Sequence, residues 1–339
     1  MASWRRAMVG HPRSVGGTAG YAPAMAFTLG VHVGQQNSSM DDLRALWRRF
    51  DAAGLDWLSA WDHLYEAPPA GGETPHFEAV ATLAAMAAET SRIRLGCLMF
   101  CVPYRNPALL AKAAVAIDHI SGGRFEIGVG AGWHEPEFVA HGYEFGTWGE
   151  RFQMLEEGLE ILQGMFTQER TSFSGRHYQV DDVSCVPGPV RGRLPIWIGG
   201  RGPKRTPSIA ARYADGYNTP YVSPEVYRSL SEGIDRACEE IGRDPATIER
   251  TVNLSFNLST TPEAAAREQA RFDAMPEDSR QTFLDGSLRG TPDQVPERIA
   301  EYAAAGATGV NIALRLPVDG DALDAYLDEV VPVVRRELG

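Results

Sequence analysis

The segment from Arg92 to Trp133 alternates between strand and helix patterns with few linking residues, and it constrains the fold more than any other part of the chain. Residues 92–100 form a nearly continuous apolar run, as expected for a parallel strand that is covered on both faces. Asn106 and Pro107 then supply an N-cap and a first-turn proline for a helix. Residues 124–132 form a second buried strand that ends in glycines. Parallel α/β folds place their binding sites at such strand ends.

The same unit of a strand followed by a helix recurs along the chain. Apolar runs predict six further strands, at residues 27–33, 55–61, 195–200, 214–220, 251–259 and 309–316. Three later helices are predicted to begin with one device, an N-cap, a proline and an acid, at Ser223, Thr261 and Thr291. Eight strands that alternate with helices predict an α/β fold, a closed (β/α)8 TIM barrel with insertions.

Two segments do not fit the repeat. Residues 167–194 are rich in turn residues and predict an irregular excursion beside the barrel mouth, whereas residues 265–290 predict a helical insertion. No boundary divides residues 25–339, so we expect them to form a single domain. Residues 1–24 carry arginines and glycines without the apolar core of a signal peptide, and we expect a flexible N-terminal extension.

The composition excludes several classes of protein. A net charge of −12 argues against a nucleic-acid partner, which needs a basic surface. No stretch approaches the roughly 18 apolar residues of a membrane span, so no membrane partner is expected. The four cysteines form no C-x-x-C pair and no metal-ligand spacing, which predicts reduced, buried thiols in a cytoplasmic protein.

An acid and a histidine, Asp62 and His63, directly follow the second predicted strand and would therefore stand at the catalytic rim of a barrel. A histidine beside a carboxylate can act as a general acid or base, because imidazole titrates near neutral pH and the carboxylate fixes its tautomer. A helix-capping aspartate beside a surface histidine would give the same sequence. His32 ends the first strand in a similar way, and we expect it to be a wall of the pocket.

A glycine-rich turn with three cations lies at residues 199–205, between the fifth strand and a helix. Exposed N–H groups and a helix N-terminus predict a phosphate site there, although a flexible turn with solvated charges is the structural alternative. The turn is not a P-loop, and the glycines at 128–132 lack the dinucleotide spacing. No serine nucleophile motif and no metal-ligand motif accompanies these residues. This combination indicates that a bound cofactor carries out the chemical step.

Five segments, which include the features above, resemble the bacterial luciferase-like flavin and deazaflavin oxidoreductases. They lie at residues 53–65, 90–138, 149–162, 194–202 and 290–312. Within that family the chain is most similar to the branch that uses the deazaflavin coenzyme F420. The resemblance implies a TIM-type barrel with the coenzyme at its C-terminal mouth, frequent homodimers, and hydride transfer between coenzyme F420 and a small organic substrate.

The resemblance also implies roles for individual residues. Asp62 and His63 match the pair beside the reactive carbon of the coenzyme ring, and Leu98-Met99 match a non-prolyl cis peptide bond behind the ring. The turn near the ring and its phosphoribityl chain is matched by Gly130, Ala131 and Trp133, and the phosphate loop by Gly199, Gly200, Arg201 and Gly202. Some deazaflavin sugar-phosphate dehydrogenases carry a glutamate where Trp133 stands, so their substrate is not implied here.

Two alternatives remain open at the level of the sequence. An FMN-dependent monooxygenase that uses reduced flavin and O2 would have the same fold, and an aromatic pocket built from Trp61, Trp133 and Tyr104 would serve either cofactor. A non-catalytic flavin- or deazaflavin-binding protein would keep the phosphate loop without needing His63. The sequence does not identify the substrate.

Overall fold

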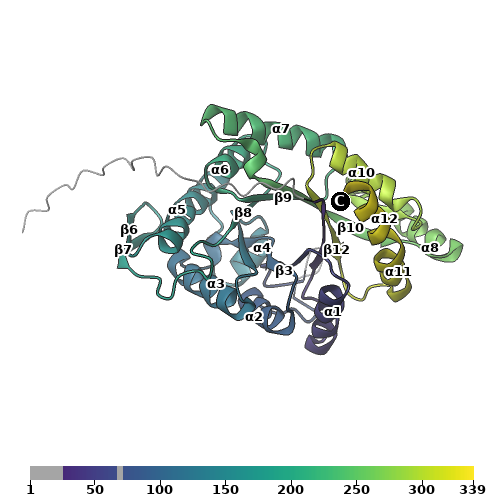
Figure 1. Cartoon of the computed structure of the whole chain (residues 1–339), viewed down its shortest axis with the longest axis horizontal. Helices are drawn as coiled ribbons and strands as arrows, with labels where there is room; N and C mark the ends of the chain where they lie inside the picture. The colour runs from purple at the N-terminus through teal and green to yellow at the C-terminus, as the bar shows by residue number, and fades with distance from the viewer. Residues whose placement is uncertain (1–25, 67–71) are drawn as a thin grey trace, which may run out of the picture.

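The computed structural model describes residues 26–66 and 72–339 of the chain, and the predicted extension at residues 1–24 lies outside this part. Eight parallel strands close into a barrel surrounded by helices (Figure 1). The barrel strands are β1 (Thr28–Val33), β2 (Trp57–Ala60), β3 (Arg94–Cys97), β5 (Phe125–Gly130), β8 (Ile196–Gly199), β9 (Gly216–Pro220), β10 (Glu249–Leu258) and β12 (Gly309–Leu314). The predicted (β/α)8 barrel with insertions is confirmed.

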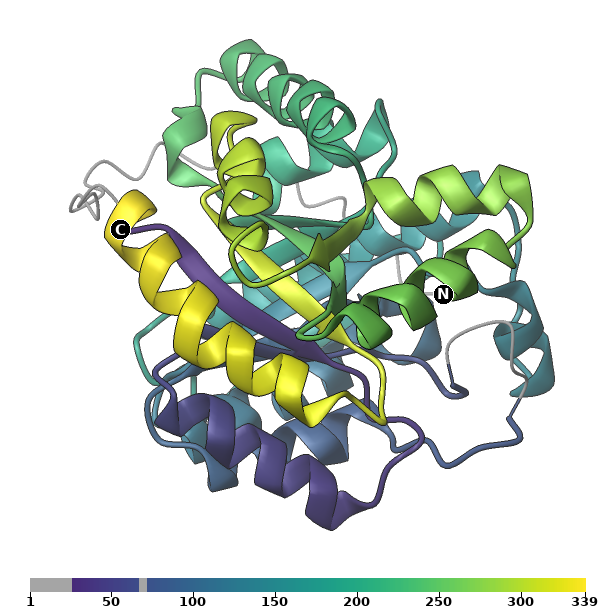
Figure 2. The ribbon, with the colours of Figure 1, turned by 90° about the vertical axis from the view of Figure 1, so that its right-hand side faces the viewer.

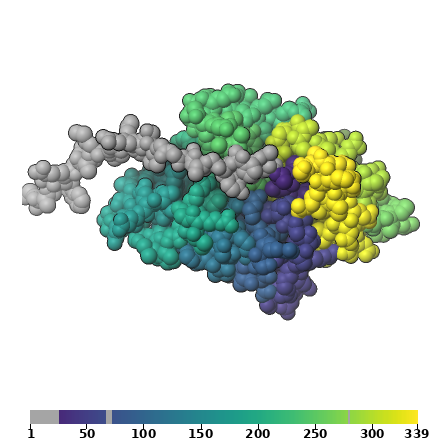
Figure 3. Space-filling model, in the orientation of Figure 1, coloured from purple at the N-terminus to yellow at the C-terminus, as the bar shows by residue number. Residues whose placement is uncertain are grey.

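The barrel closes where the two ends of the chain meet. β1 pairs in parallel with β2 on one side and with β12 on the other. In the pair of β1 with β12, Thr28 lies opposite Gly309 and Val33 lies opposite Leu314. Figure 2 shows β1 in purple beside the yellow C-terminal segment, and Figure 3 shows that purple and yellow parts of the described chain are also neighbours on the surface. Because these strands are buried on both faces, they contain the continuous apolar runs seen in the sequence.

Helices follow the strands and cover the outside of the barrel. They are α1 (Met40–Ala52), α2 (Ala79–Glu89), α3 (Pro107–Ser121), α5 (Trp148–Thr167), α6 (Arg205–Tyr213), α7 (Pro224–Glu240), α10 (Val295–Ala304), and the C-terminal α11 (Gly320–Ala325) and α12 (Val331–Leu338). No helix in the described ranges is long and apolar enough to span a bilayer. All four cysteines are buried and free, in agreement with the expected reduced thiols.

Most of the predicted helix starts are confirmed. The side chains of Asn106 and Ser223 cap α3 and α7 by accepting hydrogen bonds from first-turn N–H groups. Thr291 is the exception, because α10 begins only at Val295, whose N–H group donates to the Thr291 carbonyl. The Thr-Pro-Asp sequence at that place forms a turn that precedes the helix, and this prediction was wrong.

The predicted strand at residues 92–100 is divided into two parts. β3 pairs with β2 and with the start of β5, whereas the short strand β4 (Phe100–Cys101) pairs with the end of β5. The peptide bond between Leu98 and Met99, which lies between the two parts, is cis, as the family resemblance implies.

The two insertions differ in position. Residues 167–194 contain an antiparallel hairpin, β6 (Thr171–Ser174) and β7 (Gln179–Val183), which contacts α5 on the outside of the barrel. The loop after β7 lies on α3, where Lys112 Nζ donates to the Val186 carbonyl at 2.9 Å. Hydrogen bonds of the excursion hold it against the outer helices, and the main cavity of the barrel is lined by none of its residues.

The second insertion is helical, as predicted. It consists of α8 (Pro262–Asp273) and α9 (Glu277–Asp285), and a short strand β11 (Ser287–Gly290) follows it. β11 pairs with residues 255–258 of β10, beyond the part of β10 that pairs with β9. This pairing places α8 and α9 beside the C-terminal end of the barrel (Figure 2).

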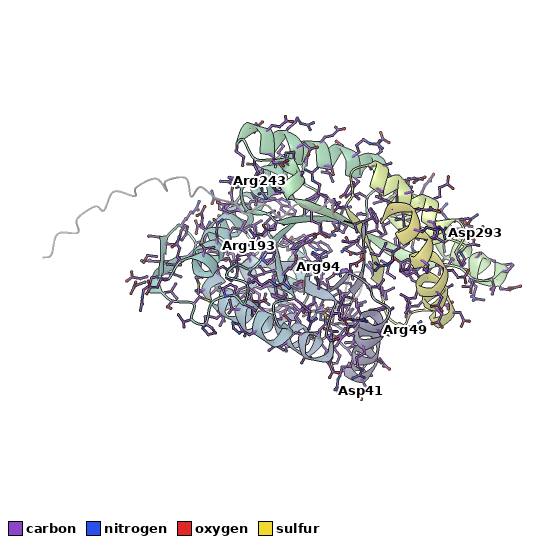
Figure 4. The ribbon with its side chains drawn as sticks, viewed as in Figure 1. Asp41, Arg49, Arg94, Arg193, Arg243 and Asp293 are labelled. Atoms are coloured by element: carbon purple, nitrogen blue, oxygen red, sulfur yellow. The ribbon has the colours of Figure 1, made fainter. Side chains whose placement is uncertain are left out.

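Charged side chains fill the N-terminal end of the barrel. Arg94 lies at the centre of the ring of strands (Figure 4) and donates two hydrogen bonds to Glu249, at 2.8 and 2.9 Å. It also donates to Glu126 at 3.2 Å, and the indole of Trp197 donates to the same carboxylate at 2.6 Å. Arg94, Glu126 and Glu249 are therefore all paired, and we call these three residues together with Trp197 the lower network.

Candidate active site

A cavity of about 870 Å³ lies at the C-terminal ends of the barrel strands. Its lining includes residues from every barrel strand or from the turn that follows it, such as His32 near the end of β1 and Arg315 after β12. All eleven residues that the resemblance assigned to cofactor binding line this cavity: Asp62, His63, Leu98, Met99, Gly130, Ala131, Trp133, Gly199, Gly200, Arg201 and Gly202. The structure thus brings the separate sequence motifs to one place, as the topology of a barrel requires.

His63 is held by a carboxylate that sequence reasoning missed. Nδ1 of His63 lies 2.9 Å from Oε2 of Glu137, which is on the short helix α4 (Glu135–Ala140) after β5. The hydroxyl of Tyr104 donates to the same oxygen at 2.8 Å. Oε1 of Glu137 accepts hydrogen bonds from the backbone N–H groups of Leu64 and Tyr65. The carboxylate is 1% exposed, whereas the His63 side chain is 19% exposed and lines the cavity.

The protonation state of Glu137 follows from these contacts. Burial raises its pKa, but the hydrogen bonds from His63, Tyr104 and the Tyr65 N–H group, together with the attraction to His63, outweigh burial and lower the pKa to about 2. An ionised carboxylate can only accept hydrogen bonds, so Nδ1 of His63 must carry a proton. Nε2 is then the ring nitrogen that remains available to a ligand in the cavity.

Asp62 has a different role from the one expected of it. Its carboxylate accepts two hydrogen bonds from Arg105, at 2.6 and 2.8 Å, and one from the Cys101 N–H group at 2.8 Å. Burial raises the pKa of Asp62, and the arginine opposes that effect. The expectation that Asp62 fixes the tautomer of His63 was wrong, because Arg105 holds the buried carboxylate of Asp62. Asp62 lines the cavity and positions the turn that carries Tyr104.

His32 is a wall of the cavity, as expected. Its Nδ1 lies 2.9 Å from the Ser59 hydroxyl, and its ring packs edge-on against Trp61 at a centroid distance of 5.2 Å. Burial, with a smaller contribution from the nearby His63, lowers the pKa of His32 to about 3. The ring is therefore neutral at physiological pH and adds shape to the cavity without adding charge.

The glycine loop after β8 is close-packed. A Cβ atom at Gly199 would overlap the Met99 side chain, and Gly200 has φ of +145°, which side-chain-bearing residues rarely adopt. The Tyr217 hydroxyl donates to the Gly200 carbonyl at 2.6 Å. The loop thus needs glycine at both positions, and its backbone is free of side chains that would keep a ligand at a distance.

Two of the three cations of the loop, Arg205 and Arg201, differ in their contacts. Arg205 does not line the cavity and donates to Glu156 at 2.7 Å. Arg201 is exposed, lines the cavity and has no hydrogen-bond or ion-pair partner among the described residues. Helix α6 begins at Arg205 without a side-chain cap, so its first N–H groups remain free to meet an anion. The buried Thr206, which sequence reasoning missed, also lines this part of the cavity.

Aromatic and apolar side chains form the remaining walls. Trp133 and Trp148 line the cavity although their side chains are 56% and 58% exposed, which is unusual for tryptophan. Leu98 and Met99 pack against a buried pair of indoles below the cavity. A cavity with flat apolar walls, one histidine and a glycine loop fits an elongated ligand that carries a planar ring and an anionic group. The residues present therefore fit a phosphorylated ring cofactor.

The missed residues had weak signals in the sequence. Glu137 lies five residues after the Gly132 turn, on a short helix that the strand and helix patterns did not predict. Arg105 stands just before an evident helix start and resembles a surface residue in the sequence. A search for acids within five residues after each predicted strand would have included Glu137.

Comparison with known proteins identifies the family to which the chain is similar. Residues 24–282 match the family described as luciferase-like monooxygenase. An F420-dependent glucose-6-phosphate dehydrogenase of Nocardia farcinica is 32% identical over 229 residues, which are 65% of this chain and 65% of that protein. The chain thus aligns with just under two thirds of the length of this relative.

Solved structures share the fold at low sequence identity. An F420-dependent secondary alcohol dehydrogenase in complex with an F420–acetone adduct superposes with a TM-score of 0.79 at 19% identity, over 91% of this chain and 99% of that one. An EDTA monooxygenase from Chelativorans superposes with a TM-score of 0.76 at 17% identity, over 93% and 95% of the two chains. These similarities establish the barrel architecture, which dehydrogenases and monooxygenases have in common.

Proposed function

The chain belongs to the luciferase-like monooxygenase family, and from this premise we propose that it is an oxidoreductase that transfers a hydride between coenzyme F420 and a small organic substrate. Relatives named as F420-dependent dehydrogenases support this assignment of the coenzyme. The observation that carries the proposal is one cavity that contains both a histidine held by an ionised glutamate and a close-packed glycine loop.

Each wall of the cavity has a role in this proposal. The backbone of residues 199–202, the first turn of α6 and the Thr206 hydroxyl would bind the coenzyme phosphate. Leu98, Met99 and the backbone of Gly130 and Ala131 would contact the ring. The exposed Trp133 would cover the ring or the substrate and exclude water.

Bound F420 supplies the two-electron carrier for the hydride transfer. In the proposed mechanism Nε2 of His63 accepts the proton that leaves the substrate oxygen during oxidation, or donates it during reduction. Glu137 stays ionised and accepts the Nδ1 proton, so it stabilises the imidazolium that forms when Nε2 takes up a proton. The Tyr104 hydroxyl and the two backbone N–H groups keep Glu137 in place.

Turnover of the coenzyme tests this proposal. Oxidised F420 is mixed with the protein and a panel of alcohols and sugar phosphates, reduced F420 with a panel of ketones and enones, and coenzyme absorbance is followed. We expect substrate-dependent turnover with at least one compound, and none with NAD(P). Oxygen consumption with reduced FMN would instead favour the monooxygenase. A bound coenzyme whose redox state never changes would favour a binding protein.

We also propose that the protein is a homodimer. Large apolar side chains that are 45% to 75% exposed lie on α3 and on the adjacent loop after β7: Leu109, Ile120, Val186 and Val190. Such residues on one surface are typical of a subunit interface. Light scattering should give twice the chain mass of 37.0 kDa, and Val186→Asp should shift the protein toward the monomer.

A cytoplasmic location and a single domain complete the proposal. The four free, buried cysteines fit a reducing compartment. One hydrophobic cluster contains residues from Phe27 to Val334, which supports a single domain over residues 25–339. Limited proteolysis of the native protein should therefore leave a resistant fragment that starts near residue 25.

A further inference from the structure

A second pocket opens from the main cavity and is not used in the mechanism above. It has a volume of about 580 Å³ and lies between the helical insertion (α8 and α9) and the C-terminal ends of β10 and β12. Arg201, Tyr221 and Arg315 line both this pocket and the main cavity. A ligand in the second pocket can therefore extend to the coenzyme cavity. We call the second pocket the arginine pocket.

Four arginines line the arginine pocket, and three of them are uncompensated. Arg201, Arg267 and Arg315 are exposed and have no hydrogen-bond or ion-pair partner within residues 26–66 and 72–339. Arg271 is held by Asn257 Oδ1 at 2.7 Å and by Glu268 at 3.0 Å. Arg201 follows β8, and Arg315 follows β12. Arg267 and Arg271 lie on α8, so the fold assembles the four guanidinium groups from distant parts of the chain.

The acids in the arginine pocket are already engaged. Glu268 pairs with Arg271, and Asp319 caps α11 by accepting hydrogen bonds from the N–H groups of Asp321 and Ala322. The chain as a whole has a net charge of −12. Three uncompensated arginines at one pocket of an acidic protein therefore produce a local positive potential that opposes the overall charge.

Apolar residues complete the arginine pocket. Phe256, Leu258 and Val318 line it together with Phe283 of α9. These walls can contact a carbon skeleton, while the guanidinium groups are suited to bidentate hydrogen bonds with a carboxylate or a phosphate. The pocket therefore matches an organic anion better than either an apolar compound or an inorganic ion alone.

We propose that the arginine pocket binds the anionic group of the substrate, a carboxylate or a phosphate, while the rest of the substrate reaches the coenzyme cavity past Tyr221. This inference rests on the proposed function and deepens it, because it defines the substrate class as organic anions. The same chemistry could come from an acidic group of the coenzyme, and the experiment below separates the two sources.

Inorganic phosphate serves as the probe in isothermal titration of the full-length protein saturated with F420, so that the glycine loop is already occupied. We expect wild-type protein to bind phosphate, and Arg267→Ala and Arg315→Ala to weaken that binding at least tenfold each. The affinity for F420 should be unchanged in Arg267→Ala, which lies outside the coenzyme cavity. Arg228→Ala, an exposed arginine on α7, is the matched control and should bind phosphate like wild type.

Three results would overturn the proposal: no phosphate binding by the saturated wild-type protein, equal phosphate affinity in all variants, or a tenfold loss of F420 affinity in Arg267→Ala. The last result would assign the pocket to the coenzyme. Failure of the proposed function is read separately, as the absence of F420 binding by wild-type protein. In that case the same variants are compared for phosphate binding in coenzyme-free protein. We again expect Arg267→Ala and Arg315→Ala to weaken phosphate binding at least tenfold, and equal affinity in all variants would again overturn the proposal.

Discussion

The two ends of the barrel use charged residues in opposite ways. At the N-terminal end, Arg94, Glu126 and Glu249 satisfy one another, and no charge of the lower network is left to meet a ligand. At the C-terminal end, His63 keeps one ring nitrogen available, and Arg201 has no partner in the described part of the chain. Stability is concentrated at the first end and binding capacity at the second.

The difference arises from how each group is paired. A buried ion pair that is complete stabilises geometry, and removing one partner leaves an uncompensated charge. Glu137 shows that the same principle operates at the catalytic end, since a buried, fully hydrogen-bonded carboxylate holds the histidine from behind. The cavity is therefore lined by groups such as His63 that keep a hydrogen-bonding atom available to a ligand. Behind them lie groups such as Glu137, whose hydrogen bonds are all made within the protein.

The largest expected effect concerns the groups that line the cavity. His63→Ala should lower the rate of hydride transfer about 10²-fold to 10⁴-fold, because a positioned acid or base contributes that much. The free energy of unfolding should fall by less than in a variant that breaks the lower network, because Glu137 keeps its hydrogen bonds from Tyr104 and two backbone N–H groups. The F420 affinity should stay nearly constant, since the imidazole contributes to proton transfer rather than to phosphate binding. Stopped-flow absorbance of the coenzyme measures the rate, with His134→Ala as the control on a neighbouring histidine. Equal single-turnover rates in His63→Ala and wild type would make His63 a wall residue.

A disruption of the lower network should have the opposite profile. Arg94→Met should reduce the free energy of unfolding by about 3 kcal/mol, because the buried Glu249 and the largely buried Glu126 would remain without their cation. Urea denaturation measures the loss, and Arg201→Met at the open end should change stability by less than about 0.5 kcal/mol. If the two variants lost equal stability, the contrast between the two ends would be contradicted.

The glycine loop gives a smaller effect, limited to binding. Gly200→Val should weaken F420 binding by about 2 kcal/mol, because φ of +145° is strained for valine and the loop would lose hydrogen bonds to a charged group. Gly122→Val is the matched control, since it also has positive φ but lies at the end of α3 with open space around it. A folded Gly200→Val protein with unchanged affinity would show that the loop is only structural.

The last expected effect is a pH dependence of stability at Glu137, which develops only in acid. Its pKa falls from 4.5 to about 2 on folding, so the contribution of the ionised carboxylate is complete above pH 4.5 and is lost as the pH falls toward 2. The difference in free energy of unfolding between wild type and Glu137→Gln should therefore shrink over that pH range. A difference that stays constant from pH 6 to pH 2.5 would contradict the ionised state of Glu137.

Sequence patterns predicted the eight strands and most helices because burial on both faces imposes long apolar runs. They also brought the glycine loop and His63 to one rim, since strand ends converge in a barrel. Hydrogen bonds between side chains were harder to predict from the sequence. Asp62 is adjacent to His63 in sequence but bonds to Arg105, whereas Glu137, 74 residues away, holds the histidine. Contacts of this kind depend on tertiary packing, which has no local sequence pattern.

The central claim is that the open end of the barrel binds a deazaflavin coenzyme, and a fluorescence titration of the purified protein with oxidised F420 and with FMN tests it most directly. We expect a dissociation constant for F420 that is micromolar or tighter, and weaker binding of FMN. Tighter binding of FMN, with oxygen consumed in the presence of the reduced flavin, would contradict the account and assign the cavity to a monooxygenase.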